Sequence, residues 1–161
     1  MSLRSLAKIA IVFLGAWQTA GAQPTKEPHT TTRAQAKVTV QSSEAKPYEQ
    51  AAGPALSEIR ISETFAGDIH AESTVRALQI QRADHSANLV SMQRVNGKLG
   101  GREGSFVLQG TETVENGNIK ATWSVVPGSG TGGLTGLRGE GGFAGQFGKA
   151  TDAWLNYWFE P

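Results

Sequence analysis

The chain has 161 residues, which suits one domain and leaves no room for a second. It carries 15 basic and 14 acidic side chains and no run of Lys and Arg, so a phosphate-binding surface is not expected and nucleic acid is excluded as a partner. The absence of cysteine excludes disulfides, thiolate metal ligands and a cysteine nucleophile.

The first 22 residues have the pattern of a secretory signal peptide. Arg4 and Lys8 form a positive start, residues 9–17 an apolar centre, and Ala20-Gly21-Ala22 a small-residue cleavage site. The apolar centre is less than half the roughly 20 residues that a membrane-spanning helix needs, so no stable membrane anchor is expected. We therefore predict export to the periplasm or the extracellular medium after cleavage near Ala22.

Residues 23–35 contain two Pro, four Thr and no apolar periodicity, and they are predicted to form a flexible polar tail. From Ala36 to Pro161, short segments of alternating polarity are separated by Gly, Asn, Asp and Pro. This spacing is typical of antiparallel strands joined by hairpins. The sequence thus predicts a signal peptide over 1–22, a tail over 23–35 and a single antiparallel β-barrel domain over 36–161.

About eight strands are expected. Alternation of apolar and polar residues marks a first strand at Val38 and Val40 and a second from Ile59 to Phe65. Later strands are predicted over residues 69–81, 88–95, 105–114, 118–126, 141–147 and 154–159, with turns at 67–68, 84–86, 96–97 and 116–117. Between Gly128 and Gly148 lie 10 of the 20 glycines, which leaves room for only a helical turn near Leu134 to Leu137.

Eight short antiparallel strands fit either a sandwich or a barrel. We favour a single closed antiparallel barrel, because closure removes exposed edges and this strand number just holds side chains or one small ligand. The twofold period of a strand then places one apolar set inside the barrel. That set is Phe106, Leu108, Ile119, Ala121, Trp123, Val125, Leu155, Tyr157 and Phe159.

Motifs for cofactors and metals are weak. Residues 128–133 match the dinucleotide pattern G-x-G-x-x-G, but the residues after Gly133 are too rich in glycine for the helix that must receive the pyrophosphate. The three His and three Asp lie in the tail, at strand ends or at turns, with no shared face. No serine lies in a nucleophile elbow. We predict no cofactor and no metal.

Three polar side chains share alternating faces with apolar neighbours: Glu63, Gln93 and Glu112. If buried, such groups need partners, and burial would shift the pKa of a carboxyl toward its neutral form. A ligand could be that partner; alternatively, each group lies near solvent or pairs with Arg76, Arg94 or Arg138. The candidate cavity wall comprises Glu63, Gln93, Phe106, Glu112, Trp123, Arg138, Glu140 and Tyr157.

Several segments resemble a bacterial family, the "domain of unknown function 3224" family. They are residues 64–69 (TFAGDI), 104–109 (GSFVLQ), 121–132 (ATWSVVPGSGTG) and 137–143 (LRGEGGF), and the resemblance runs from about Ala36 to Glu160. It implies an allene-oxide-cyclase-like, calycin-type barrel, in agreement with the strand count.

The same resemblance implies Glu at the position of Gln93 and His at the position of Gly110 in many relatives. Because Gln does not titrate and Gly has no side chain, proton transfer at those two positions is not expected in this chain.

Two functions remain open. One is an exported barrel that binds a small, largely apolar molecule or a protein partner, with no assignable reaction. The alternative is an isomerase or cyclase that holds a flexible apolar substrate in the cavity while Glu63, Glu112 or Glu140 stabilises developing positive charge. Because related barrels assemble through their outer faces, a homo-oligomer is a further expectation.

Overall fold

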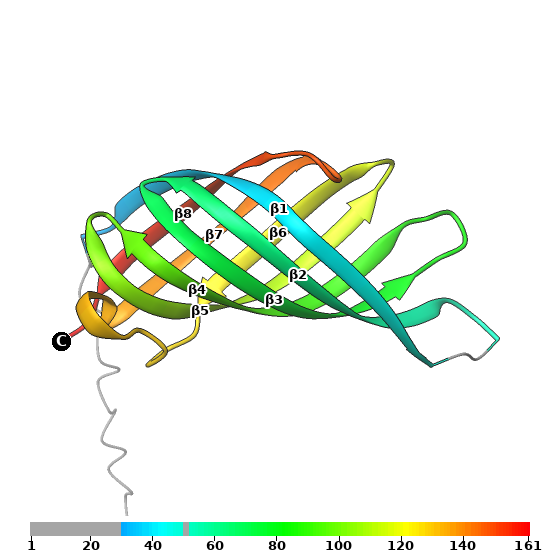
Figure 1. The fold of residues 1–161 in the computed structure, drawn as a ribbon, viewed down its shortest axis with the longest axis horizontal. Helices are drawn as coiled ribbons and strands as arrows, with labels where there is room; N and C mark the ends of the chain where they lie inside the picture. The colour runs from blue at the N-terminus through cyan, green and yellow to red at the C-terminus, as the bar shows by residue number, and fades with distance from the viewer. Residues whose placement is uncertain (1–29, 50–51) are drawn as a thin grey trace, which may run out of the picture.

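A computed structural model describes residues 30–49 and 52–161, so the predicted signal peptide and most of the predicted tail lie outside the described residues. The described chain forms a closed antiparallel barrel in which each strand pairs with the next and β8 pairs with β1 (Figure 1). The strands are β1 Thr32–Glu49, β2 Ala55–Gly67, β3 Ile69–Gln81, β4 Ala87–Leu99, β5 Arg102–Glu115, β6 Asn118–Val125, β7 Leu137–Gln146 and β8 Thr151–Phe159. The predicted all-β barrel of eight strands is confirmed. No helix within the described ranges has the length and apolar character to cross a bilayer.

Several boundaries differ from the sequence prediction. β1 begins at Thr32, and Ala34 is only 1% exposed opposite Leu155 of β8, so the predicted domain start at Ala36 lies inside a strand. The turn predicted at Asn96-Gly97 is wrong, because β4 continues through both residues to Leu99. Gly97 has a φ of 152° and lies against the β3 backbone at His70, where a Cβ would collide with the carbonyl oxygen.

One end of the barrel is filled with side chains. A buried apolar cluster joins inward residues of most strands, including Phe65, Ile69, Leu99, Phe106, Leu137 and Leu155. A short helical turn, η1 (Gly132–Leu134), lies across this end at the left of Figure 1 and carries Leu134, which is completely buried. The inward residues expected from the twofold period are confirmed, since Leu108, Trp123 and Tyr157 all belong to the cluster.

The glycine-rich segment after β6 closes this packed end. β6 pairs with β5 only from Leu108 onward, so the first half of β5 would have a free edge. The segment supplies the missing partners: the Val126 N–H donates to the Val107 carbonyl at 2.8 Å and the Thr131 N–H to the Ser105 carbonyl at 2.8 Å. Gly104 lies so close to the Thr131 carbonyl that any side chain there would collide. The glycine-rich residues 128–133 therefore help to close the barrel.

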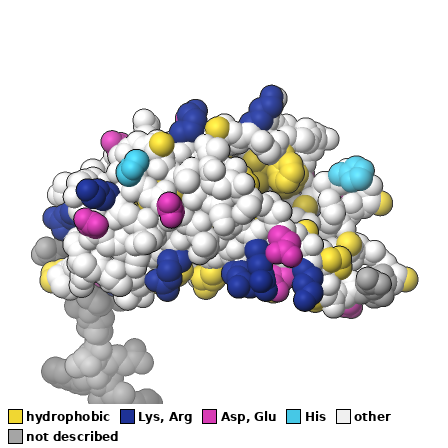
Figure 2. Space-filling model, viewed as in Figure 1, with side chains coloured by type: hydrophobic (Ala, Val, Ile, Leu, Met, Phe, Trp, Pro, Cys, Tyr) yellow, Lys and Arg dark blue, Asp and Glu magenta, His cyan; other side chains and the backbone are white. Residues whose placement is uncertain are grey.

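The opposite end is open. The β1–β2 and β3–β4 hairpins project farthest at the right of Figure 1, beyond the turns that join β5 to β6 and β7 to β8. β1 pairs with β8 only as far as Val38, whereas it pairs with β2 as far as Glu49. Figure 2 shows hydrophobic side chains in a recess right of centre, on the half of the molecule toward this open end.

Candidate ligand-binding cavity

The open half of the barrel encloses a cavity of about 440 Å³. Its apolar wall includes Ile59, Val75, Leu89, Val114, Ile119 and Phe143, all on inward positions of their strands. The turn between β7 and β8 borders it through residues 146–149, and Val40 of β1 also lines it. This volume is in the range of roughly 300–1,000 Å³ found for small-molecule pockets.

Glu63 is the most deeply buried acid of the cavity, with 8% of its surface exposed. Its Oε2 accepts hydrogen bonds from Gln93 Nε2 at 2.7 Å and from Ser73 Oγ at 3.4 Å, and Gln93 Nε2 also lies 2.8 Å from Ser73 Oγ. Burial raises the pKa of Glu63 to about 7; the Ser73 and Gln93 hydrogen bonds oppose this rise, and the Glu112 charge adds to it. Glu63 can therefore gain or lose a proton near neutral pH.

Glu112 is the second acid in the cavity. Ser91 Oγ donates to Glu112 Oε1 at 2.6 Å, and Glu112 Oε2 is buried without a hydrogen-bond partner in the structure. Burial raises the pKa of this carboxyl as well, although the Ser91 hydrogen bond opposes the change. The absence of a side chain at Gly110 leaves room for the hydrogen bond between Ser91 and Glu112, because a Cβ at that position would lie 2.7 Å from both Glu112 Oε1 and Ser91 Oγ.

Neither acid has a cationic partner in the part of the chain that the structure describes. The ion pairs found between described residues are Lys37–Asp152, Arg60–Glu58, Arg76–Glu58 and Arg138–Glu160, and none includes Glu63 or Glu112. Lys149, at the mouth, is the single basic residue among the described residues that line the cavity. The alternative that Arg76, Arg94 or Arg138 neutralises these acids is wrong, because strand alternation places all three arginines on the opposite face.

Trp123 lies at the boundary between the two halves of the barrel. Its ring is 5.4 Å from Phe143 in an edge-on arrangement and 6.3 Å from Phe65, which belongs to the packed cluster. The indole Nε1 is buried without a hydrogen-bond partner in the structure and lies against Gly141, where any side chain would collide with it. The ring therefore forms part of the floor of the cavity.

The structure brings together four of the eight predicted wall residues: Glu63, Gln93, Glu112 and Trp123. Phe106 and Tyr157 also point inward, but they lie in the packed cluster.

For Arg138 and Glu140 the prediction needs correction, because β7 turns Leu137, Gly139 and Gly141 inward and both charged residues outward. Arg138 instead pairs with Glu160 at 2.8 Å.

Sequence reasoning missed Ser73 and Ser91, which hold the two carboxyls. The sequence does indicate that both serines point inward, since Ser73 lies two residues before Val75 on the same face of β3 and Ser91 two residues before Gln93 on the same face of β4. A small hydroxyl on an inward position is easily taken for a packing residue. Within the described ranges, no group of three or more His, Asp or Glu side chains could hold a metal ion.

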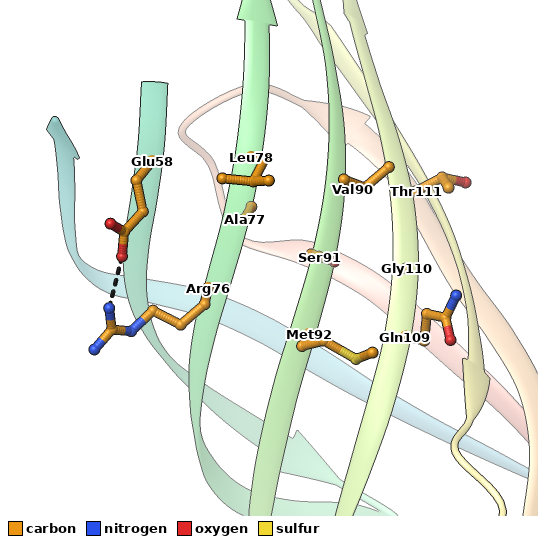
Figure 3. Close-up of a pocket in the computed structure, with 10 residues that line it drawn as sticks. All are labelled: Glu58, Arg76, Ala77, Leu78, Val90, Ser91, Met92, Gln109, Gly110 and Thr111. Carbon is orange, nitrogen blue, oxygen red and sulfur yellow. Dashed lines mark hydrogen bonds and ion pairs between the residues drawn. The ribbon is translucent and has the colours of Figure 1, made fainter. Parts of the chain in front are cut away.

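A second depression lies on the outer wall over β2 to β5 (Figure 3). Leu78, Val90 and Met92 line it, each about half exposed, beside the ion pair between Arg76 and Glu58 at 2.6 Å. Hydrogen bonds from Arg76 and Arg60 hold the pKa of Glu58 below its usual range. Because its apolar side chains stay exposed, this groove encloses a ligand much less than the interior cavity does.

Fold and site together define a small antiparallel β-barrel that is packed at one end and hollow at the other, with two carboxyl groups buried in the hollow. The model of the family described as proteins of unknown function (DUF3224) matches residues 34–157, and the chain belongs to that family. This confirms the resemblance noted in the sequence.

A solved structure is similar to the whole barrel. It is the crystal structure of a protein with unknown function from the DUF3224 family of Shewanella oneidensis MR-1, with a TM-score of 0.67 and 31% identity over 82% of this chain and 100% of that chain. No curated protein matches the chain. The allene-oxide-cyclase-like and calycin-type relationship stays a prediction.

Proposed function

We propose that this protein is an exported barrel that binds one small, largely apolar molecule in its hollow half. The observation that supports this most is a cavity of about 440 Å³ whose apolar wall surrounds buried hydrogen-bonding groups, one of which, Glu112 Oε2, has no partner. Buried polar atoms are nearly always hydrogen-bonded, so an orphaned carboxylate oxygen inside a cavity favours a ligand that completes it.

Side-chain size supports the same proposal. The packed end is filled largely by Phe and Leu side chains, whereas the inward positions of the hollow end mix larger apolar residues with the small residues Ser43, Ala45, Ala77 and Ser91. An empty apolar cavity forfeits packing and burial, at about 25 cal/mol per Å² of apolar surface left uncovered. A ligand that covers this wall would recover that free energy, and the small residues leave the space for it.

Export rests on the leader at residues 1–22. The proposal expects the mature chain to begin at Gln23, and intact-mass measurement of protein recovered from the periplasm or medium checks this. A mature mass that still includes the leader would contradict export by cleavage at this site.

Two neighbouring residues offer a matched test of the cavity. Leu89 points into it, and Val90, the next residue of β4, points outward and is 55% exposed. We expect Leu89→Trp to fill the hollow and abolish binding of the neutral dye Nile red, while Val90→Trp leaves binding unchanged. Native mass spectrometry of gently purified protein should also show a co-purifying small mass that Leu89→Trp lacks. Loss of dye binding in Val90→Trp alone would instead place the ligand in the outer groove.

The isomerase or cyclase alternative stays a prediction. Glu63 and Glu112 lie in the cavity as that mechanism requires, but Glu140 is exposed on the outer wall. Assembly into a homo-oligomer also stays a prediction, and sedimentation would test it.

A further inference from the structure

We propose that the molecule bound in the hollow half carries a positively charged amine-type group, which lies between Glu63 and Glu112, on an apolar body. This inference rests on the proposed function and specifies the chemical class of its ligand. The charges, the hydrogen-bonding groups and the wall of the cavity support it.

The charges of the cavity floor are unbalanced. Glu63 and Glu112 both line the same hollow, and the charge on Glu112 acts on Glu63. Ser91 and Gln93 are consecutive inward residues of β4 and hold one carboxyl each, so the two anchoring points are about 7 Å apart along the strand. One small cation can bridge such a spacing. It would supply the counter-charge that no described side chain provides at the cavity floor.

The hydrogen-bonding groups of the cavity favour a ligand that donates hydrogen bonds over a ligand that accepts them. Gln93 already donates to Glu63 and Ser91 already donates to Glu112, so the donors nearest to the two acids are in use. What remains is acceptor capacity on the two carboxyls; Glu112 Oε2 has no hydrogen-bond partner, and because almost none of its surface is exposed, a ligand reaches it only when this side chain turns toward the hollow. A primary ammonium has three N–H donors and no acceptor, and its hydrogen bonds to carboxylates are about twice as strong as neutral ones. A carboxylate or phosphate ligand would meet like charge at the floor.

The wall above the acids is apolar and contains aromatic rings. Trp123 and Phe143 line the hollow beside the acids, and aromatic faces attract cations. Ile59, Val75 and Ile119 cover the space toward the mouth, where a hydrocarbon body of the ligand would be buried. The ligand class is therefore an amphipathic amine.

Calorimetric titration with octylamine, octanol and octanoate at pH about 8 tests this class, because an alkyl ammonium stays charged there while Glu63 is mostly ionised. We expect octylamine to bind about tenfold tighter than octanol, and octanoate to bind more weakly than either. Glu112→Gln and Glu63→Gln should each reduce the preference for the amine over the alcohol. The control Glu72→Gln, on the outward face of β3, should leave the preference unchanged.

The outcomes separate the two proposals. If octanol binds the wild-type protein as tightly as octylamine, the amine class is wrong while small-molecule binding stands. If Nile red, octylamine and octanol all fail to bind, both proposals are wrong. Should Glu112→Gln fail to fold, the wild-type series and Glu63→Gln still decide, because Gln at position 63 retains an oxygen that can accept from Gln93.

Discussion

The two ends of the barrel are built from the same strands with the same alternation, yet they do different things. At one end inward Phe106, Leu99 and Leu155 form one buried cluster with Leu134. At the other, inward Ser91 and its neighbours leave a hollow of about 440 Å³ that contains two carboxyls. The difference teaches that one strand pattern can serve two ends: where inward residues meet Leu134 of the η1 turn in one buried cluster, the barrel holds the fold together, and where small inward residues lie among larger ones, it leaves room for a ligand.

The largest expected effect contrasts the two ends directly. Phe106 is 2% exposed in the packed cluster, so Phe106→Ala should lower the free energy of unfolding by about 3–5 kcal/mol. Leu89 faces a hollow that is already open, so Leu89→Ala should lower it by only about 1 kcal/mol. Urea unfolding of both variants measures the difference. Equal losses would mean that the hollow end is as tightly packed as the other.

Next in size is the effect of pH through Glu63. Burial raises the pKa of this carboxyl from 4.5 to about 7, so the folded protein binds its proton more tightly than the unfolded chain does. The resulting stability is fully present below pH about 4.5 and is lost as the pH rises through about 7. The loss by pH about 8 is on the order of 3 kcal/mol.

Glu63→Gln should therefore be more stable than the wild type at pH about 8 and should show a flatter stability profile between pH about 5 and about 8. Urea midpoints across this range measure it. The dependence of stability on pH that remains in Glu63→Gln should come from Glu112, whose pKa is also raised by burial. The control Glu72→Gln should keep the wild-type slope. Parallel profiles for wild type and Glu63→Gln would show that Glu63 is not buried as described.

A smaller effect concerns the space around Glu112. A Cβ at Gly110 would crowd Ser91 Oγ and Glu112 Oε1, so Gly110→Ala should break their hydrogen bond and lower the free energy of unfolding by about 1 kcal/mol. Ser91→Ala removes the same bond without adding an atom at position 110 and should have a similar effect. Because both changes act on one contact, the double variant should be clearly less destabilised than the sum of the two. Additive losses would place Gly110 outside this interaction.

The smallest expected change in stability is at the mouth. Phe147 is 63% exposed on the turn between β7 and β8, so Phe147→Ser should change the free energy of unfolding by less than about 0.5 kcal/mol. Because its ring borders the cavity, the same variant should bind octylamine a few-fold more weakly. Unchanged affinity would place the apolar body of the ligand away from this turn.

Local pattern predicted the strands and which face of each points inward, because side-chain direction repeats every two residues. Ile69–Gln81 has the predicted bounds, and the inward direction of Leu108 and Trp123 is correct. The prediction for Arg138 and Glu140 is wrong because the predicted strand begins at Gly141, whereas β7 begins at Leu137 and its alternation turns both side chains outward. The Asn96-Gly97 turn signal was overridden by pairing of β4 with both neighbouring strands.

Position along the barrel axis could not be predicted from one strand. Phe106 and Glu112 both point inward from β5, but one lies in the packed end and the other in the hollow. Which end a residue reaches depends on strand tilt and on the register between neighbours, and both are set by the whole closed sheet. The hydrogen bond between Gln93 and Glu63, which spans β3, depends on the same register.

The most direct test of a ligand site in the hollow half is the backbone amide and indole NMR spectrum of the protein titrated with octylamine. We expect chemical-shift changes at residues of the hollow, such as Val75, Ser91, Glu112 and the indole N–H of Trp123, and almost none at Phe106 or Leu134 in the packed end. Changes confined to Leu78, Val90 and Met92 on the outer wall, or no changes with either octylamine or octanol, would contradict a ligand site in the hollow half.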